Sequence, residues 1–162
     1  MRKITNTSAV ADEAMTTDSS KITGQVRHPA ITAASILCYI HGVGWPISLA
    51  SPIVYMIRNR ALQVRTLPGI GQIRGLAGPF EALGMDAMIL LALLFSVVNL
   101  LFIPAGYWLW KSRRKGGMLA DSLLALSAVF WWGFALPIPP IVGLLLAGLL
   151  AAGWKSLGGG RL

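Results

Sequence analysis

Cysteine is nearly absent from the chain, because Cys38 is the only one among its 162 residues. A single cysteine excludes an intrachain disulfide and a redox relay between two thiols, and it leaves too few thiolates for a zinc cluster. Histidine is almost as scarce, with only His28 and His41. We therefore expect no metal and no other cofactor.

Several enzyme and transporter motifs are missing as well. The chain has no Gly-x-Ser-x-Gly nucleophile elbow and no Gly-x-x-x-x-Gly-Lys phosphate loop. A quinone-linked thiol oxidoreductase needs cysteine pairs. Small multidrug exporters depend on a glutamate in their first span, and residues 29–57 contain none. We therefore expect that the protein is not an enzyme.

Charged residues are also few. They make up 12% of the chain, whereas soluble domains carry about 25%, and 55% of the residues are hydrophobic with a mean hydropathy of +0.66. The net charge of +8 would suggest nucleic-acid binding in a soluble protein, but here the basic residues flank apolar runs. Such residues determine membrane topology and contact anionic lipids. We expect a lipid bilayer as partner and no nucleic acid.

Long uncharged runs are what the chain does contain. Residues 87–110 are 24 consecutive residues without a formal charge. At about 1.5 Å per residue, a helix of this length is roughly 36 Å long, enough to cross a hydrocarbon core of about 30 Å. A soluble core helix is rarely this long and apolar on every face. This run predicts a membrane span over about 86–110.

Two further runs predict three more spans. The run 29–57 contains Pro46 and Pro52, which predict a bent helix or an early end. The run 122–154 is too long for one crossing, and the prolines within 136–140 predict a turn there. The expected fold class is all-α, a polytopic membrane protein with a bundle of about four transmembrane helices. Their expected bounds are about 29–57, 86–110, 118–136 and 139–157.

The rest of the chain is organised around these spans. Residues 1–26 are polar and lack the apolar block of a secretory signal, so we expect a mobile N-terminal tail before a membrane domain over 27–157. Residues 158–162 are expected to form a short C-terminal tail. The connection 58–84 is rich in glycine, proline and arginine, and one interpretation places a short interfacial helix over about 58–67.

Charge counting predicts the orientation. Four spans leave both termini on one side, and with the termini inside, ten lysines and arginines lie inside against four in the 58–84 connection outside. The positive-inside rule then predicts a protein of the cell membrane with both termini in the cytoplasm. An alternative stays open. If the 58–84 connection lies on the cytoplasmic side, either the run 29–57 is re-entrant or the total number of spans is odd. The turn after residue 110 holds four candidate contacts for anionic lipid: Lys111, Arg113, Arg114 and Lys115.

Two segments have a recognisable pattern. Residues 27–37 read Arg-His-Pro-Ala-Ile-Thr-Ala-Ala-Ser-Ile-Leu, and residues 106–111 read Gly-Tyr-Trp-Leu-Trp-Lys. They resemble the basic-Pro-x-small-aliphatic-Thr opening and the Gly-x-x-Leu-Trp exit of spans in small uncharacterised four-helix membrane proteins of bacteria and archaea. The resemblance implies a four-helix membrane fold over about 27–157. It implies no catalytic or ligand residues, since that set of proteins has no agreed activity.

His41 and Asn99 are the candidate intramembrane polar residues, because a polar group at depth is costly and marks a functional hypothesis by default. His41 is a candidate proton relay or metal ligand, with a hydrogen bond to a neighbouring helix as the simpler interpretation. Asn99 is expected to hydrogen-bond across helices. Asp86 and Asp121 are expected in the first turns of their spans, where a carboxylate complements the helix dipole; an ion pair with Arg114 or Lys115 is a further hypothesis for Asp121.

Small residues recur at helical spacing in the first and last runs. Ala34, Cys38 and Gly42 stand four apart, which allows another helix backbone to approach closely. The last run holds five candidate helix-packing residues with the same spacing: Gly143, Ala147, Gly148, Ala151 and Ala152.

Two functional hypotheses follow. The favoured one is a small integral membrane protein that acts by helix packing, as a homo-oligomer or as an accessory subunit of a membrane complex. The alternative is a minimal transporter or channel whose internal polar path uses His41 and Asn99.

Overall fold

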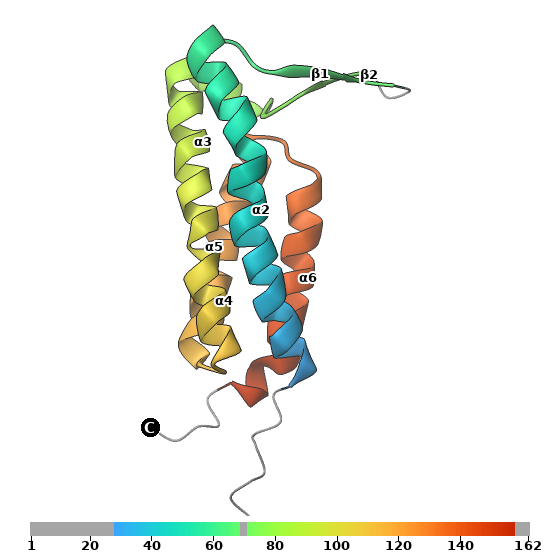
Figure 1. The fold of residues 1–162 in the computed structure, drawn as a ribbon, viewed down its shortest axis with the longest axis vertical. Coiled ribbons are helices and arrows are strands. Elements are labelled where there is room, and N and C mark those ends of the chain that lie inside the picture. Colours follow the sequence, from blue (N-terminus) through green and yellow to red (C-terminus); the bar gives the residue numbers. More distant parts are fainter. Residues whose placement is uncertain (1–27, 69–70, 158–162) are drawn as a thin grey trace, which may run out of the picture.

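The computed structural model describes residues 28–68 and 71–157. The chain forms an elongated bundle of helices that run along one long axis (Figure 1). Its helices are α2 Pro29–Asn59, α3 Met85–Leu100, α4 Phe102–Trp110, α5 Arg114–Gly133 and α6 Ile138–Gly153, followed by a 3-10 helix, η3, at Trp154–Ser156. The tails expected over 1–26 and 158–162 lie outside the described residues.

Helix α2 is continuous over 31 residues. His28 caps its start, since Nδ1 of that side chain accepts a hydrogen bond from the Ala30 backbone N–H at 3.3 Å. The helix continues through Pro46 and Pro52, so the early end suggested by these prolines is wrong. Each proline removes one backbone N–H. Burial of neighbouring side chains such as Leu49 against the bundle holds the segment in the helix.

The central run contains a break. Helices α3 and α4 are separated at Leu101, so the span expected over 86–110 consists of two successive helical segments. Pro104 lacks the N–H that would bond the Leu100 carbonyl, and this loosens the preceding turn. The Leu101 N–H is shared between the carbonyls three and four residues before it, each at 3.2 Å. Together the segments cover 26 residues.

The connection between α2 and α3 folds as a small antiparallel hairpin of β1, Val64–Leu67, and β2, Gly71–Arg74. The interfacial helix suggested for 58–67 is therefore wrong. Helix α2 ends where Arg60 adopts left-handed backbone, and Pro68 lies where the chain turns between the strands. The hairpin projects sideways from one end of the bundle (Figure 1).

Two ion pairs tie this end of the molecule together. After the hairpin, the 3-10 helix η2, Pro79–Leu83, leads into α3. Arg60 pairs with Asp86 in the first turn of α3, and Arg74 pairs with Glu81 at 3.6 Å. The first-turn position expected for Asp86 is confirmed. Because these side chains are largely exposed, each pair is worth at most about 1 kcal/mol.

The proline-rich turn separates α5 from α6 as expected. Helix α5 begins at Arg114, four residues before the expected start at 118. Its first turn packs directly on α4, because a Cβ at Gly116 would lie 2.5 Å from the Leu109 backbone nitrogen and only glycine fits. Helix α6 starts one residue before the expected 139.

The small-residue face of α2 is a helix contact. Ala34, Cys38 and Gly42 are buried, and a Cβ at Gly106 of α4 would lie 3.1 Å from the Cys38 Cβ. The close approach predicted for this face is therefore confirmed. Helix α2 lies against α3, α4 and α6, and α5 packs on the same three helices.

The start of α2, the α4–α5 turn and the end of α6 lie at one end of the bundle, which we call the basic-turn end (Figure 1). The hairpin and the α5–α6 turn lie at the other, the hairpin end. The segments α2, α3 with α4, α5, and α6 therefore alternate in direction. This arrangement brings the first and last described residues to the same end of the molecule.

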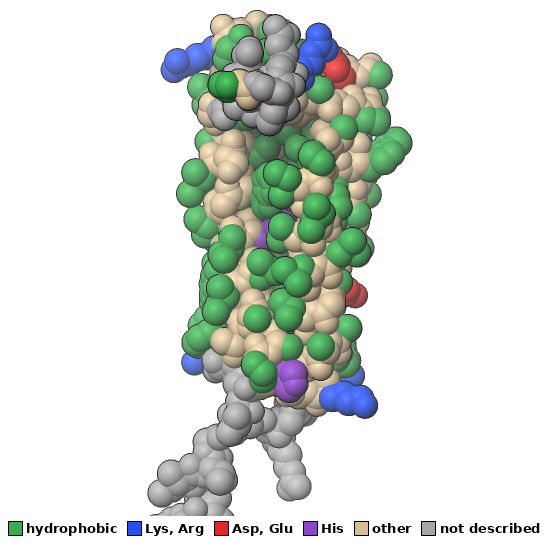
Figure 2. Space-filling view, turned by 90° about the vertical axis from the view of Figure 1, so that its right-hand side faces the viewer, with side chains coloured by type: hydrophobic (Ala, Val, Ile, Leu, Met, Phe, Trp, Pro, Cys, Tyr) green, Lys and Arg blue, Asp and Glu red, His purple; other side chains and the backbone are tan. Residues whose placement is uncertain are grey.

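By length and composition, three helical segments of the described chain can cross a membrane: α2, α3 with α4, and α6 with η3. Helix α5 is not among them, and its 20 residues include Arg114, Lys115 and Asp121. Large hydrophobic side chains such as Ile47 and Leu144 face outward. Figure 2 shows hydrophobic side chains over the flank and lysine and arginine side chains gathered at the ends. These features are compatible with a multi-pass membrane protein.

Candidate functional site

Four buried polar side chains from three helices form the candidate site, which we call the polar layer. They are His41 of α2, Asn99 of α3, and Ser127 and Trp131 of α5. The sequence predicts the first two, since each interrupts an apolar run. The spacing of four between Ser127 and Trp131 puts them on one face of α5, but only the structure shows that this face is buried.

His41 makes one hydrogen bond and keeps one nitrogen without a partner. The indole Nε1–H of Trp45, one turn further along α2, donates to His41 Nδ1 at 3.2 Å. Since Nδ1 accepts, the neutral imidazole carries its proton on Nε2. Nε2 is buried without a hydrogen-bond partner in the described part of the chain, so the bond expected to a neighbouring helix is not formed. The ring packs edge-on against Phe102 and Trp131, with centroids 4.7 and 6.5 Å away.

Asn99 likewise bonds within its own helix. Its Nδ2 donates to the Phe95 carbonyl at 2.7 Å, and Oδ1 is buried without a partner among the described residues. The expected hydrogen bond from Asn99 to another helix is therefore wrong. Its backbone carbonyl lies at the contact with α2, where a Cβ on Gly42 would come within 3.2 Å. Because Gly42 follows His41 directly, the two predicted residues lie on one pair of contacting helices.

Ser127 and Trp131 complete the polar layer from α5. The Ser127 hydroxyl and the Trp131 Nε1–H are both buried without a partner in residues 28–68 and 71–157. The adjacent Trp132 is 70% exposed, whereas Trp131 points inward, where its ring occupies the space beside Gly143 of α6. A rotation of about 100° per residue places the two indoles on different faces.

Helix geometry puts three of the four polar residues at a similar depth, whereas Trp131, 17 residues after the start of α5, lies about 26 Å from that start. At about 1.5 Å per residue, His41 lies about 18 Å from the start of α2, and Ser127 lies about 20 Å from the start of α5. Asn99 lies eleven residues before the end of α4, about 17 Å away. All these distances are measured from the basic-turn end. The shared level of His41, Asn99 and Ser127 is near the middle of a hydrocarbon core about 30 Å thick.

The atoms left without partners are chemically complementary. His41 Nε2 and Trp131 Nε1 are donors, Asn99 Oδ1 is an acceptor, and the Ser127 hydroxyl can do both. Leaving such a group unpaired in an apolar interior costs about 1–3 kcal/mol. Each of these four atoms therefore has the capacity for one further hydrogen bond. In the described ranges, no three His, Cys, Asp or Glu side chains are grouped to hold a metal ion.

A groove reaches His41 from the side of the bundle. It encloses about 240 Å³ between α2 and α6 and is lined by Ile40, His41, Gly44, Trp45, Ser48 and Val142. Figure 2 shows that the flank is hollowed between hydrophobic side chains. No residue of this lining except His41 can ionise in the physiological range, so the groove has no fixed charge to hold an ion.

The four candidate lipid contacts are all exposed at the basic-turn end: Lys111, Arg113, Arg114 and Lys115. Lys111 Nζ lies 5.8 Å from the Tyr107 ring centroid, and the Arg114 guanidinium lies 5.6 Å from that of Trp154. Aromatic rings beside cations are typical of the level of lipid headgroups.

The five small residues of α6 do not share one environment. Gly143 points into the bundle, where a Cβ would overlap the Trp131 ring, and Ala147 is half-buried. The other three are exposed, and we call them the α6 outer face: Gly148, Ala151 and Ala152. A Cβ at Gly148 would meet no atom within 4 Å. The bundle thus uses Gly143 for its own packing and leaves the α6 outer face uncovered.

The first-turn position expected for Asp121 is wrong. Helix α5 begins at Arg114, so Asp121 lies seven residues inside it, and no acidic residue lies in its first turn. The carboxylate is exposed and has no ion pair or hydrogen bond to any residue that the structure describes, Lys115 included. It borders a pocket of about 280 Å³ together with Ala147, Leu150, Ala151 and Trp154.

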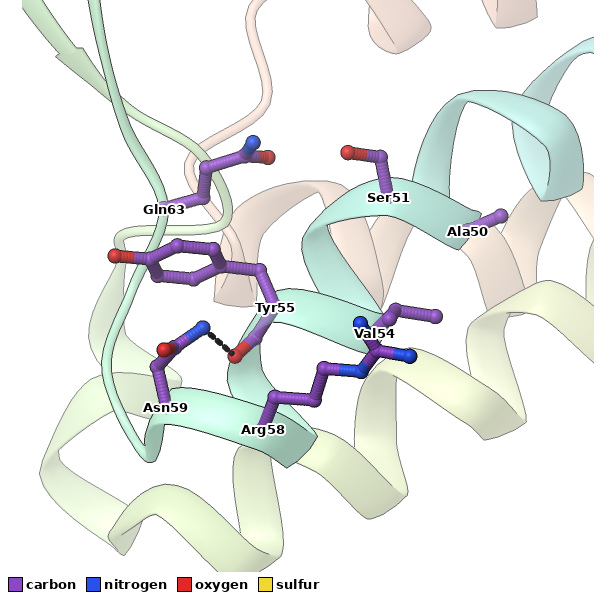
Figure 3. A pocket seen from close by; sticks show the side chains of 7 residues that line it. All are labelled: Ala50, Ser51, Val54, Tyr55, Arg58, Asn59 and Gln63. Atoms are coloured by element: carbon purple, nitrogen blue, oxygen red, sulfur yellow. Dashed lines mark hydrogen bonds between the residues drawn. The ribbon is translucent and has the colours of Figure 1, made fainter.

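A second polar pocket lies at the hairpin end of α2 (Figure 3). It encloses about 450 Å³ and is lined by Ala50, Ser51, Val54, Tyr55, Arg58, Asn59 and Gln63. Asn59 Nδ2 donates to the Tyr55 carbonyl at 3.0 Å, and the Arg58 side chain extends beside Val54. An arginine with amide groups near a helix end suits contact with polar lipid headgroups.

No known protein family, curated protein or solved structure matches the chain. The resemblance to small four-helix membrane proteins over 27–37 and 106–111 stays a prediction.

Proposed function

We propose that the protein is a small multi-pass membrane protein that acts by helix packing, as a homo-oligomer or an accessory subunit of a larger membrane complex, and not as an enzyme. The α6 outer face carries the proposal. Gly148, Ala151 and Ala152 are exposed on a helix that is otherwise apolar. In lipid, no hydrophobic force drives helices together. Small residues allow the helix backbones to approach closely, and the van der Waals contact between them then stabilises the association.

The proposal includes four crossings, with α5 as the fourth. Helix α5 packs beside the three apolar segments, and its 20 residues give about 30 Å, the thickness of a hydrocarbon core. Both termini and the turn over 111–115 face the cytoplasm across the cell membrane, and that turn contacts anionic headgroups.

Substitution of Gly148 by isoleucine tests the role of the α6 outer face. Since a Cβ there meets no atom within 4 Å, Gly148→Ile leaves the bundle intact, yet it separates any helix that docks on this face. The control is Leu145→Ile, which keeps a large side chain at a position that is 57% exposed. The measurement is the mass of the assembly extracted from native membranes in mild detergent. We expect Gly148→Ile to reduce it toward the single 17.3 kDa chain and Leu145→Ile to leave it unchanged.

Thermal unfolding of both variants is measured in the same detergent. Equal unfolding temperatures combined with loss of the assembly in Gly148→Ile alone support the proposal. Assemblies of equal mass for the wild type and both variants contradict it.

The polar layer favours a second candidate function, a minimal transporter or channel with an internal polar path. Its supporting observation is the set of atoms left without partners at mid-depth, His41 Nε2 and Asn99 Oδ1 among them. The test is ion and proton flux through vesicles that contain the purified protein. Helix packing predicts no protein-dependent flux for the wild type or for His41→Gln. A pH-dependent wild-type flux that folded His41→Gln lacks would replace the first proposal with the second.

A further inference from the structure

Asp121 is an isolated charge on an apolar flank. It lies seven residues inside α5, about 10 Å along the helix from Arg114. Exposed residues around it on α5 include the apolar Met118, Leu126 and Val129 as well as the adjacent Ser122. Figure 2 shows an acidic side chain among the hydrophobic side chains of the flank, away from the lysine and arginine side chains at the ends.

No described residue neutralises this carboxylate. Both ion pairs in the described ranges lie at the hairpin end. Arg114, one of the cations on the same helix, lies over the ring of Trp154, which lines the same pocket, and forms no ion pair with Asp121. An ionised side chain exposed to hydrocarbon is expensive, and such groups in membrane proteins generally face a partner or a water-filled cavity.

The pocket beside Asp121 borders the α6 outer face, because Ala151 belongs to both. Its α6 lining is Ala147, Leu150 and Ala151. Alanine side chains leave room for another helix to approach. The volume of about 280 Å³ is below the range of about 300–1,000 Å³ typical of small-molecule sites, and it suits one long side chain.

We infer that this pocket receives a lysine or arginine side chain from a transmembrane helix of a different protein. The inference rests on the proposed function, since it names the partner that packs along the α6 outer face. We expect a cation because it complements the charge of the carboxylate. The ion pair leaves no net charge exposed to lipid, and it fixes the depth and direction of the docked helix.

A second copy of this chain fits less well. The lysines and arginines of the described helices lie at helix ends, so a copy in the same orientation brings apolar residues or another Asp121 to the pocket. A lipid ammonium group fits less well too, since headgroups lie at the level of Arg114, about 10 Å further out.

The test uses the full chain in phosphatidylcholine vesicles with a synthetic transmembrane peptide of about 20 leucines and alanines. One peptide carries a lysine two helical turns from one end, and its control carries leucine there. Energy transfer between labelled protein and labelled peptide reports binding. We expect the lysine peptide to bind the wild type at least about tenfold more tightly than the leucine peptide, and Asp121→Asn to remove this preference. Ser122→Ala, a change at the neighbouring exposed position, should keep it.

Equal binding of the two peptides to the wild type, or a preference that Asp121→Asn retains, overturns the inference. A second measurement follows energy transfer between copies of the protein without peptide. If this transfer is higher for Asp121→Asn than for the wild type, a second copy occupies the α6 outer face and the inference is overturned. These outcomes are separate from the test of helix packing. If Gly148→Ile disrupts the native assembly while both peptides bind equally, the proposed function stands and the assignment of Asp121 fails.

Discussion

At the scale of single residues, the glycines of the bundle have opposite roles that only their surroundings reveal. Gly116 touches backbone: a Cβ there would lie 2.5 Å from the Leu109 nitrogen and 2.9 Å from the Ala105 carbonyl oxygen. Gly44 lies in a helix as well, but a Cβ there meets nothing within 4 Å. The first glycine allows α4 and α5 to touch, and the second is free to change.

Replacement of these two glycines by alanine should therefore act in opposite directions. Gly116→Ala is expected to destabilise the protein by about 1–3 kcal/mol, because the nearby atoms are backbone and cannot give way cheaply. Gly44→Ala should be neutral or stabilising by up to about 1 kcal/mol, since alanine is the better helix former. Thermal unfolding in detergent measures both. An unfolding temperature of Gly116→Ala equal to that of Gly44→Ala would show that α5 does not pack on α4 as described.

Residue types also limit how much of the candidate site can be predicted from the sequence. His41 and Asn99 stand out because polar side chains are rare in apolar runs. Ser127 and Trp131 do not, because serine and tryptophan are ordinary in membrane helices and only the rotation of α5 shows that both point inward. The contacts of the His41 ring with Phe102 and Trp131 depend on distances between helices, which no spacing along one helix encodes.

At the scale of elements, proline alone does not decide where a helix breaks. Pro46 and Pro52 lie inside α2 without ending it, whereas the central run breaks just before Pro104. The approximate places of the helical segments follow from the lengths of the apolar runs, but the division of the central run into α3 and α4 does not. Their starts do not: charged residues such as Arg114 belong to α5, since its first turn packs on α4. For the same reason Asp121 is two turns inside a helix and not at its cap.

At the scale of the whole molecule, the arrangement of ends predicts which positions face the same compartment. Leu83 and Ile138 are 61% and 63% exposed at the hairpin end, and Lys115 is exposed at the basic-turn end. We expect single cysteines at 83 and 138, in a Cys38→Ser background, to react with an impermeant maleimide on intact cells. A cysteine at 115 should react only after permeabilisation, because the turn is expected inside.

The hairpin-end positions make this labelling decisive. Both belong to the same end of the bundle, so they must behave alike whichever way the protein is inserted. Labelling of 138 without labelling of 83 would mean that the first half of the chain does not cross as described. Labelling of 115 alone on intact cells would keep the four crossings and reverse the orientation.

The helices also differ in length, and this has a consequence for the surrounding lipid. Helix α2 spans about 46 Å, whereas α6 with η3 spans about 28 Å. A bilayer adjusts its local thickness to the hydrophobic length beside it, at a fraction of a kcal/mol per Å. In the proposed membrane setting, we therefore expect lipid next to α6 to be thinner than lipid around the longer helices. Another short helix packed on the α6 flank would relieve the mismatch between hydrophobic length and bilayer thickness. We therefore expect the α6 flank to favour both thin membranes and neighbouring proteins with short spans.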